Sequence, residues 1–255
     1  TIFFALIWNI EGCIAATIIT TSFSAIFNKK IIKEKSLAFG IKIESKINYN
    51  DAKILIQYSL PSFLFNAMII PTLWITNAML ANSANGYKEL GLINIANQWK
   101  SAALMLPAAI STSLLPYLSS QLSNTGYNKS VKASLIINIA IGIAIGGALA
   151  LASPLIIKIY GSEYKDAITP LMILSAVVTI TSINNVAGQI LASKDKMWIG
   201  FSFNTLWALI IISTSHYLIK LNYGATALAA ATLTASTVLA AAQGIYIKKT
   251  LNTKK

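Results

Sequence analysis

Seven long apolar segments, joined by short polar stretches, dominate this sequence. Hydrophobic residues make up 55% of the 255 residues, only 11% are charged, and the mean hydropathy is +0.65. Soluble domains contain roughly 45–50% apolar and about 25% charged residues, so a water-soluble fold does not suit this chain. The segments cover residues 1–27, 52–82, 90–118, 133–157, 167–191, 198–219 and 225–247.

Each segment is long enough to cross a hydrocarbon layer of about 30 Å at ~1.5 Å per residue. Because lipid offers no hydrogen-bond partners to the backbone, a spanning segment is either an α-helix or a strand of a closed barrel. Barrel strands are much shorter and alternate polar with apolar residues, a pattern that these segments lack. The sequence therefore predicts an all-α membrane protein with about seven transmembrane helices.

The lysines predict how these helices are oriented. The chain has 20 lysines and no arginine; fifteen of the lysines fall on one side of the predicted membrane and four on the other. Since lysine-rich loops stay in the cytoplasm, we expect the linker 28–51 and the basic tail 248–255 to be cytoplasmic. The net charge of +12 then reflects orientation and attraction to anionic lipids, and we expect no nucleic-acid partner.

Residues that carry chemistry are sparse. His216, the sole histidine, is expected at the outer end of its helix, and Cys13, the sole cysteine, is expected to be a small packing residue. Gly142 and Gly146 have the spacing that lets two membrane helices approach closely. The sequence contains no catalytic triad, metal-ligand cluster or phosphate-binding loop, so we predict no enzyme, no metal site and no cofactor.

Polar residues inside two neighbouring segments are the candidate functional residues. Prolines interrupt both segments, at positions 61 and 71 in one and 107 and 116 in the other. Two interpretations stay open: the polar side chains line a hydrated cavity, or they form hydrogen bonds that hold the helices together. The two polar stripes are Ser59, Ser62, Asn66 and Asn77, and then Asn94, Asn97, Gln98 and Ser101.

Lys100 lies close to the second stripe and deep within its segment. An ammonium inside a membrane costs at least ~2.5 kcal/mol, so it should face water, a carboxylate or an anionic ligand. Glu11 is predicted at a similar depth on the first segment and is a candidate counter-ion or ion-coupling residue. The alternative is that Lys100 extends its side chain to the outer interface.

Several short motifs in the second half of the chain resemble one transporter family. They resemble parts of the C-terminal lobe of O-antigen and capsule repeat-unit flippases (the Wzx type), within the multidrug/oligosaccharidyl-lipid/polysaccharide (MOP) exporter superfamily. The resemblance extends over roughly residues 51–246. The motifs are Gly91-Leu92, Ala96-Asn97-Gln98-Trp99-Lys100, Leu106-Pro107, Leu115-Pro116, Tyr160-Gly161 with Tyr164, and Tyr223-Gly224-Ala225.

This resemblance implies one lobe of a two-lobed transporter of the MATE/MOP type. Residues 52–247 would be the six-helix C-terminal lobe and residues 1–27 the last helix of the N-terminal lobe, so we expect the chain to be the C-terminal part of a longer protein. The implied site has Lys100 contacting an anionic head group, with Asn66, Asn97 and Gln98 as its polar lining.

The implied function is that of a flippase in the bacterial inner membrane. It would move an undecaprenyl-pyrophosphate-linked oligosaccharide from the cytoplasmic to the periplasmic leaflet by alternating access. Its partners would be this lipid-linked oligosaccharide and membrane lipids, with a polysaccharide polymerase and a chain-length regulator as further candidates. The alternatives are a multidrug cation exporter of the same superfamily and a noncatalytic membrane subunit of a polysaccharide export complex.

The distribution of lysines gives a first testable prediction. In a Cys13→Ala background, a cysteine at Asn128 should be shielded from a membrane-impermeant thiol reagent in intact cells, because its loop is predicted to be cytoplasmic. A cysteine at Asn222 should react, since its loop is predicted to be periplasmic. Labelling at Asn128 without permeabilisation would contradict this orientation.

Overall fold

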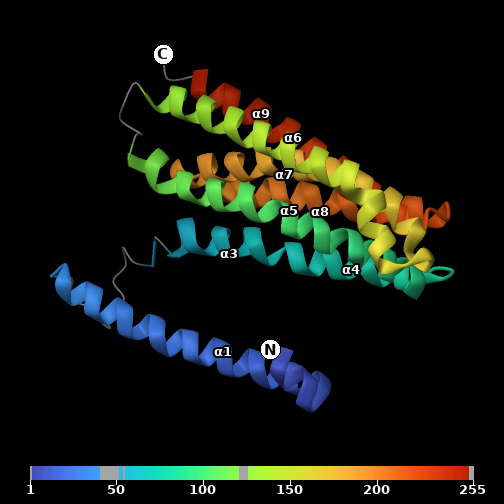
Figure 1. Cartoon of the computed structure of the whole chain (residues 1–255). Helices are drawn as coiled ribbons and strands as arrows, with labels where there is room; N and C mark the ends of the chain where they lie inside the picture. Colours follow the sequence, from blue (N-terminus) through green and yellow to red (C-terminus); the bar gives the residue numbers. More distant parts are fainter. Residues whose placement is uncertain (1, 41–51, 54, 121–125, 253–255) are drawn as a thin grey trace. The chain divides into compact units, whose positions relative to one another are not determined.

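The structure is a computed structural model that describes residues 2–40, 52–53, 55–120 and 126–252. The chain divides into two compact units, Thr1–Ala52 and Lys53–Lys255. All the regular secondary structure in the described residues is helical (Figure 1). The predicted all-α class is confirmed.

The first unit contains the long helix α1 (Ile2–Ala38). This helix includes the first apolar segment and continues beyond residue 27, into residues that the sequence assigns to a cytoplasmic linker. An exposed pair between Lys30 and Glu34, one helical turn apart with 4.0 Å between nitrogen and oxygen, adds little to its stability. The remaining predicted linker residues, 41–51, lie outside the described residues, and the division into lobe, linker and tail stays a prediction.

The second unit is a bundle in which six spans are long and apolar enough to cross a membrane. These spans correspond to the six apolar segments predicted after residue 51. Two of them include a short stretch that is not α-helical. The elements are η1 (Leu55–Ser59), α3 (Leu60–Ala67), α4 (Ile69–Ala81), α5 (Gly86–Ser120), α6 (Tyr127–Tyr160), η2 (Ser162–Ala167), α7 (Ile168–Ser193), α8 (Met197–Lys220) and α9 (Gly224–Asn252).

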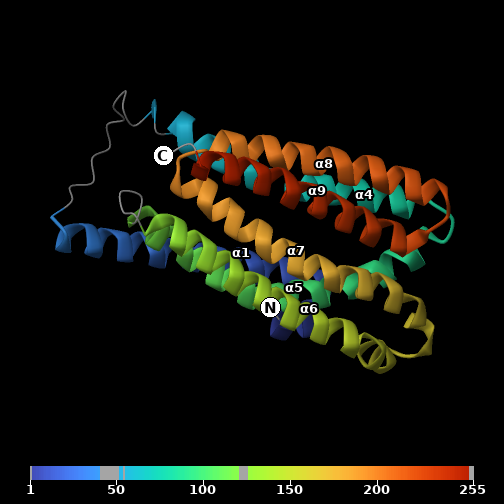
Figure 2. The same cartoon turned by 90° about the horizontal axis from the view of Figure 1, so that it is seen from above.

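Helix α7 is the centre of the bundle. It contacts α5, α6 and α9, and Figure 2 shows it between the pair α5–α6 and the pair α8–α9. Leu171, Leu174 and Val178 of α7 are fully buried there. Burial of apolar side chains adds little in lipid, because the hydrocarbon is as apolar as leucine, so close packing and hydrogen bonds hold this bundle together.

Glycines allow α6 and α7 to pack closely. A Cβ atom added at Gly146 would lie 2.6 Å from the Ser175 carbonyl oxygen, and one at Gly142 would lie 3.0 Å from the Thr179 Cα. The Thr179 hydroxyl donates a 2.9 Å hydrogen bond to the Gly142 carbonyl. The two glycines therefore serve helix packing, as their spacing predicts.

The first span of the bundle is broken into three pieces. Residues Leu55–Ser59 form a π-helical turn, and the α-helix is interrupted again at Met68. Pro61 and Pro71 each lie in the first turn of the piece that follows, where a missing N–H is tolerated. The expected break at the prolines is confirmed for this span, whereas Pro107 and Pro116 lie inside the continuous helix α5.

A carboxylate ties the start of α5 to the start of α9. Glu89 Oε2 accepts a 2.6 Å hydrogen bond from the Ala225 backbone N–H, at the start of α9, where the helix dipole favours a negative charge. Gly224 has a φ of 51°, and a Cβ at this position would collide with the Glu89 carboxylate. Only glycine meets both conditions.

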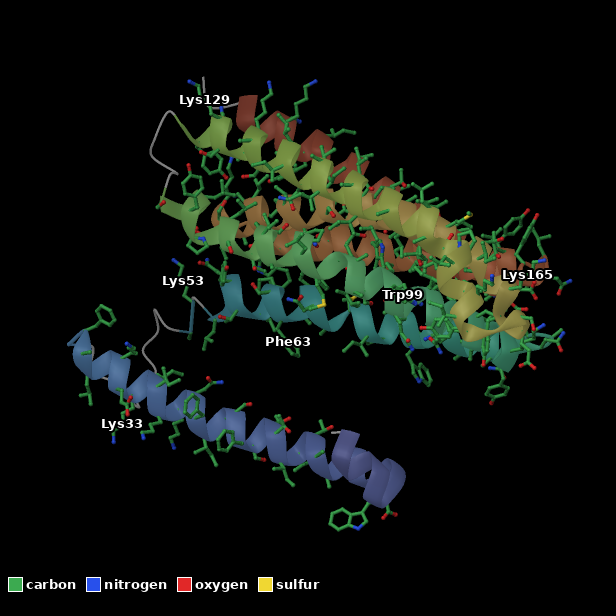
Figure 3. The ribbon with its side chains drawn as sticks, in the orientation of Figure 1. Lys33, Lys53, Phe63, Trp99, Lys129 and Lys165 are labelled. Atoms are coloured by element: carbon green, nitrogen blue, oxygen red, sulfur yellow. The ribbon has the colours of Figure 1, made fainter. Side chains whose placement is uncertain are left out.

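The ends of the bundle carry the lysines as the sequence predicts. In Figure 3, Lys53 and Lys129 lie at one end of the second unit, and Lys165 lies at the opposite end. The described linkers between α7 and α8 and between α8 and α9 also lie at these two opposite ends (Figure 1). The arrangement of the helices therefore agrees with a membrane crossing by each span in turn.

The glycine contacts between α6 and α7 predict a position-specific stability effect. Gly146→Val should lower the thermal unfolding temperature, because the added atoms meet the α7 backbone and overpacking costs about 1–3 kcal/mol. Gly147→Val is the matched control, since a Cβ at Gly147 has no neighbour within 4 Å. Equal unfolding temperatures for the two purified variants would show that the close approach is absent.

Candidate functional site: a polar surface beside a polar cavity

Helix α5 presents a polar stripe on the surface of the six-helix unit. The side chains of Asn94, Gln98, Ser101 and Thr112 are all exposed. At 100° per residue they project from the same side of the helix. Of the four residues predicted to share a face, Asn94, Gln98 and Ser101 do so, whereas Asn97 is half-buried. Thr112 lies on the same side farther along α5, beyond the exposed Met105.

Lys100 projects from a different side of α5. Residues seven or eleven positions apart point in nearly the same direction on a helix, so Lys100 shares a side with Ile93, Pro107 and Ser111, which are all buried. Its own side chain is half-buried. The Lys100 ammonium donates a 2.8 Å hydrogen bond to Asn97 Oδ1, one turn closer to the outer end. The structure thus brings Lys100 and Asn97 together and places Gln98 apart from them.

The described part of the chain offers Lys100 no counter-ion. No carboxylate in it forms an ion pair with this ammonium. Along α5, Lys100 lies roughly 16 Å inward from Glu89 at ~1.5 Å per residue, much farther than one lysine side chain reaches. Glu11 is exposed in the other unit, and its pairing with Lys100 stays a prediction.

A polar cavity of about 410 Å³ lies between the first span, α5, α7 and α8. Asn66 lines it, so this predicted site residue belongs to a different place from Lys100. The cavity lies beside the last turns of α7 and the first turns of α8, at the lysine-rich end of the bundle. The polar residues that line it are Tyr58, Ser62, Asn66, Ser111, Thr112, Asn184, Asn185 and Gln189.

Two polar atoms of this lining lack a hydrogen-bond partner among the described residues. They are Ser62 Oγ and Asn184 Oδ1, both buried. The other end of the Asn184 amide is fixed, because its Nδ2 donates a 3.2 Å hydrogen bond to the Ser236 carbonyl of α9. Buried polar atoms normally have a partner; these two have none in the described part of the chain and are also shielded from solvent, so the accessible polar groups of the lining are those of other residues, such as Asn66, Asn185 and Gln189.

Other buried amides hold helices together instead. Asn138 Oδ1 accepts a 3.0 Å hydrogen bond from the Ser111 hydroxyl, joining α6 to α5. Asn204 Nδ2 donates a 2.6 Å hydrogen bond to the Phe65 carbonyl, joining α8 to α3. Asn138 and Asn204 lie outside the two predicted polar stripes. Within the stripes Asn66 and Gln98 are exposed, and the assignment of the stripes to a cavity lining stays a prediction.

The contribution of α7 to the cavity was not predicted from the sequence. Asn184, Asn185 and Gln189 lie within an apolar span, and the spacing of Asn185 and Gln189 by one turn puts both on one face. Carboxamides at helical spacing in a membrane segment were the available signal. His216 is exposed at the outer end of α8, where it lines a groove with Asn82 and Asn222, as its position predicts.

Two curated proteins are similar to this chain in sequence. Both are named EPS I polysaccharide export inner membrane protein EpsE. The one from Ralstonia solanacearum is 25% identical over 181 residues, and the one from Ralstonia nicotianae is 25% identical over 182 residues. The matches cover 70% and 69% of this chain but only 42% and 41% of those proteins, so the chain spans less than half their length. No family model matches.

Two solved structures have the same fold. One is a MOP superfamily transporter from Pyrococcus furiosus, described as having a binding pocket of reverse polarity, with a TM-score of 0.68. The other is a multidrug resistance MATE family transporter of the MOP superfamily in an outward-facing conformation, with a TM-score of 0.64. Each is 18% identical to this chain, and each match covers 76% of this chain and 44% of the other.

These similarities confirm the resemblance that the sequence motifs indicate. The predicted inner-membrane location agrees with the names of both Ralstonia proteins. The chain is a multi-pass membrane protein with the fold of the MOP-superfamily transporters, and in sequence it is similar to polysaccharide export proteins.

Proposed function

We propose that this chain forms one lobe of a flippase in the bacterial inner membrane. The complete transporter moves an undecaprenyl-pyrophosphate-linked oligosaccharide, an O-antigen or capsule repeat unit, from the cytoplasmic to the periplasmic leaflet. It does so by alternating access, which requires two bodies that move around one site. Similarity to polysaccharide export proteins and the MOP-superfamily fold support this proposal.

The exposed polar stripe on α5 carries the proposal. Asn94, Gln98, Ser101 and Thr112 are accessible on the outside of a six-helix membrane bundle. A carboxamide without a hydrogen-bond partner in hydrocarbon costs about 2–7 kcal/mol, so this side of the bundle is unsuited to contact with lipid. It suits the wall of a water-filled path shared with the other lobe, through which sugar hydroxyls pass.

Lys100 provides the positive charge for the phosphate groups of the substrate. Asn97 occupies one of the three ammonium donors, which leaves two for an anion. A half-buried ammonium without a described carboxylate is costly in a membrane and is stabilised when an anionic group arrives. In this proposal Asn97 positions Lys100, while Asn66 and Gln98 contact the sugar part.

The distribution of acidic residues argues against a multidrug cation exporter. The described acidic residues of the six-helix unit lie near the ends of helices or in linkers, at Glu89, Glu163, Asp166 and Asp195. A cation as cargo would favour a carboxylate within the spans, and Glu11 of α1 is the candidate for that role. We therefore prefer an anionic cargo. As partners of the complete transporter we propose a polysaccharide polymerase and a chain-length regulator.

The polar stripe predicts water access inside the membrane. In the full-length protein with Cys13→Ala, a cysteine at Gln98 should react with a small charged methanethiosulfonate, because the thiolate attacks the reagent and a thiolate forms only in water. A cysteine at Ile143, an exposed apolar position on α6, is the control and should stay unmodified. Equal, slow reaction at both positions would indicate that α5 faces lipid.

The proposed role of Lys100 predicts that export depends on its charge. In a polysaccharide-producing strain that lacks its own flippase, Lys100→Ala in the full-length protein should abolish export, and Lys100→Arg should keep part of it. Arginine retains the charge but presents a wider, planar group. Lys158→Ala, at an exposed lysine near the outer end of α6, should leave export normal.

Protein abundance shows whether loss of export by Lys100→Ala comes from a lost substrate contact or from poor folding. If Glu11 is the counter-ion of Lys100, Lys100→Ala should lower protein abundance only while Glu11 is present, because the substitution leaves the Glu11 carboxylate unpaired within the membrane. Glu11→Gln in the same protein should then restore abundance without export. Normal export by Lys100→Ala at normal abundance would remove Lys100 from the site.

A further inference from the structure

We propose that the cavity between α3, α5, α7 and α8 is a carbohydrate subsite, separate from Lys100. This inference rests on the proposed function and specifies where the sugar part of the substrate is held. None of the described residues that line the cavity carries a charge. A phosphate group would find no positive partner there and would be poorly stabilised. A neutral polar molecule needs no such partner.

The lining has the chemistry that sugar hydroxyls require. A hydroxyl both donates and accepts hydrogen bonds, and so does a carboxamide; Asn66, Asn184, Asn185 and Gln189 contribute four carboxamides from two spans. Asn66 is exposed, and Asn185 and Gln189 are half-buried, so a sugar hydroxyl that enters the cavity can reach these carboxamides.

Two aromatic side chains complete the lining. Tyr58 and Phe65 come from the first span, and their rings offer flat apolar surfaces to the C–H face of a sugar ring. The volume of about 410 Å³ falls within the range of roughly 300–1,000 Å³ that is typical of small-molecule sites. It greatly exceeds the space that one water or one metal ion needs, which favours part of an oligosaccharide as the occupant.

The cavity and Lys100 are connected by one helix. Ser111 and Thr112 line the cavity and lie roughly 17 Å along α5 from Lys100 at ~1.5 Å per residue. The same helix therefore carries the cationic contact in its outer half and the neutral subsite toward the lysine-rich end. Sugar and phosphate are recognised at two places on α5.

Gly188 gives a direct way to fill the cavity. It lines the cavity on α7, and an added Cβ would meet no atom within 4 Å. Gly188→Leu should occupy the space that a sugar needs, while Gly188→Ala should leave most of it open. The matched control is Gly147→Leu, on the exposed side of α6, where a Cβ also meets no atom within 4 Å.

A second variant tests the hydrogen bonds without filling the space. Asn185→Leu replaces a carboxamide by an apolar group of similar size. Asn185 makes no side-chain hydrogen bond within the described part of the chain, so this change breaks no known contact between helices. Loss of sugar binding in this variant would then reflect the missing amide.

Binding should be measured with two probes on the purified full-length transporter. One probe is radiolabelled undecaprenyl pyrophosphate, and the other is the same lipid with its repeat unit, extracted from the producing strain. Asn185→Leu should bind the sugar-bearing lipid about tenfold more weakly, the effect of losing one or two hydrogen bonds. Gly188→Leu should weaken this binding by about tenfold or more, because it fills the space that the sugar needs. Both should bind the sugar-free lipid as the unsubstituted protein does, which also shows that they are folded. Gly188→Ala and Gly147→Leu should bind both lipids normally.

The outcomes separate this inference from the proposed function. Unchanged binding of the sugar-bearing lipid by both cavity variants would overturn the subsite, while the proposed function would stand. If the cavity variants bound both lipids more weakly by the same factor, the subsite would also be overturned, because the lost binding would not depend on the sugar. Failure of the unsubstituted protein to bind either lipid would contradict the proposed function and the subsite together.

Discussion

The structure depends on the fact that hydrocarbon supplies no hydrogen bonds to the polypeptide backbone. Each span must satisfy its own N–H and C=O groups, and α5 through α9 do so as long helices. The first span of the bundle departs from this pattern, with a π-helical turn and an interruption at Met68. Irregular backbone at membrane depth is tolerated where protein or water surrounds it, and this interruption lies in the span that forms one wall of the polar cavity.

Hydrocarbon also offers no hydrogen bonds to polar side chains, so each polar side chain in the bundle needs a partner in the protein or in water. An amide that connects two helices, such as Asn204 with the Phe65 carbonyl, meets its requirement inside the protein. An amide that is exposed, such as Gln98, requires a partner outside this lobe. The exposed amides on one side of α5 are therefore the basis for our proposal that this side faces away from lipid.

Much of the fold was predictable from the sequence, because hydropathy and lysine distribution respond to the membrane directly. The spans and the packing role of Gly142 and Gly146 were predictable, since each depends on local sequence. The role of a polar residue depends on its neighbours in space. Asn66 and Asn138 each donate a hydrogen bond to a carbonyl one turn back, yet only Asn138 meets a hydroxyl from another helix. Sequence spacing holds no information on that difference. Spacing does put Lys100 on a different side of α5 from Asn94 and Gln98, but it does not tell which helices pack against that side.

The link between Glu89 and the first turn of α9 has a mechanical consequence. It joins the start of α5 to the start of α9, and Lys88, next to Glu89, is 3.7 Å from Asp166 in η2, just before α7. The start of α5 is therefore held to two neighbouring spans at the same end of the bundle. A displacement of this end of α5 would pull on both of them.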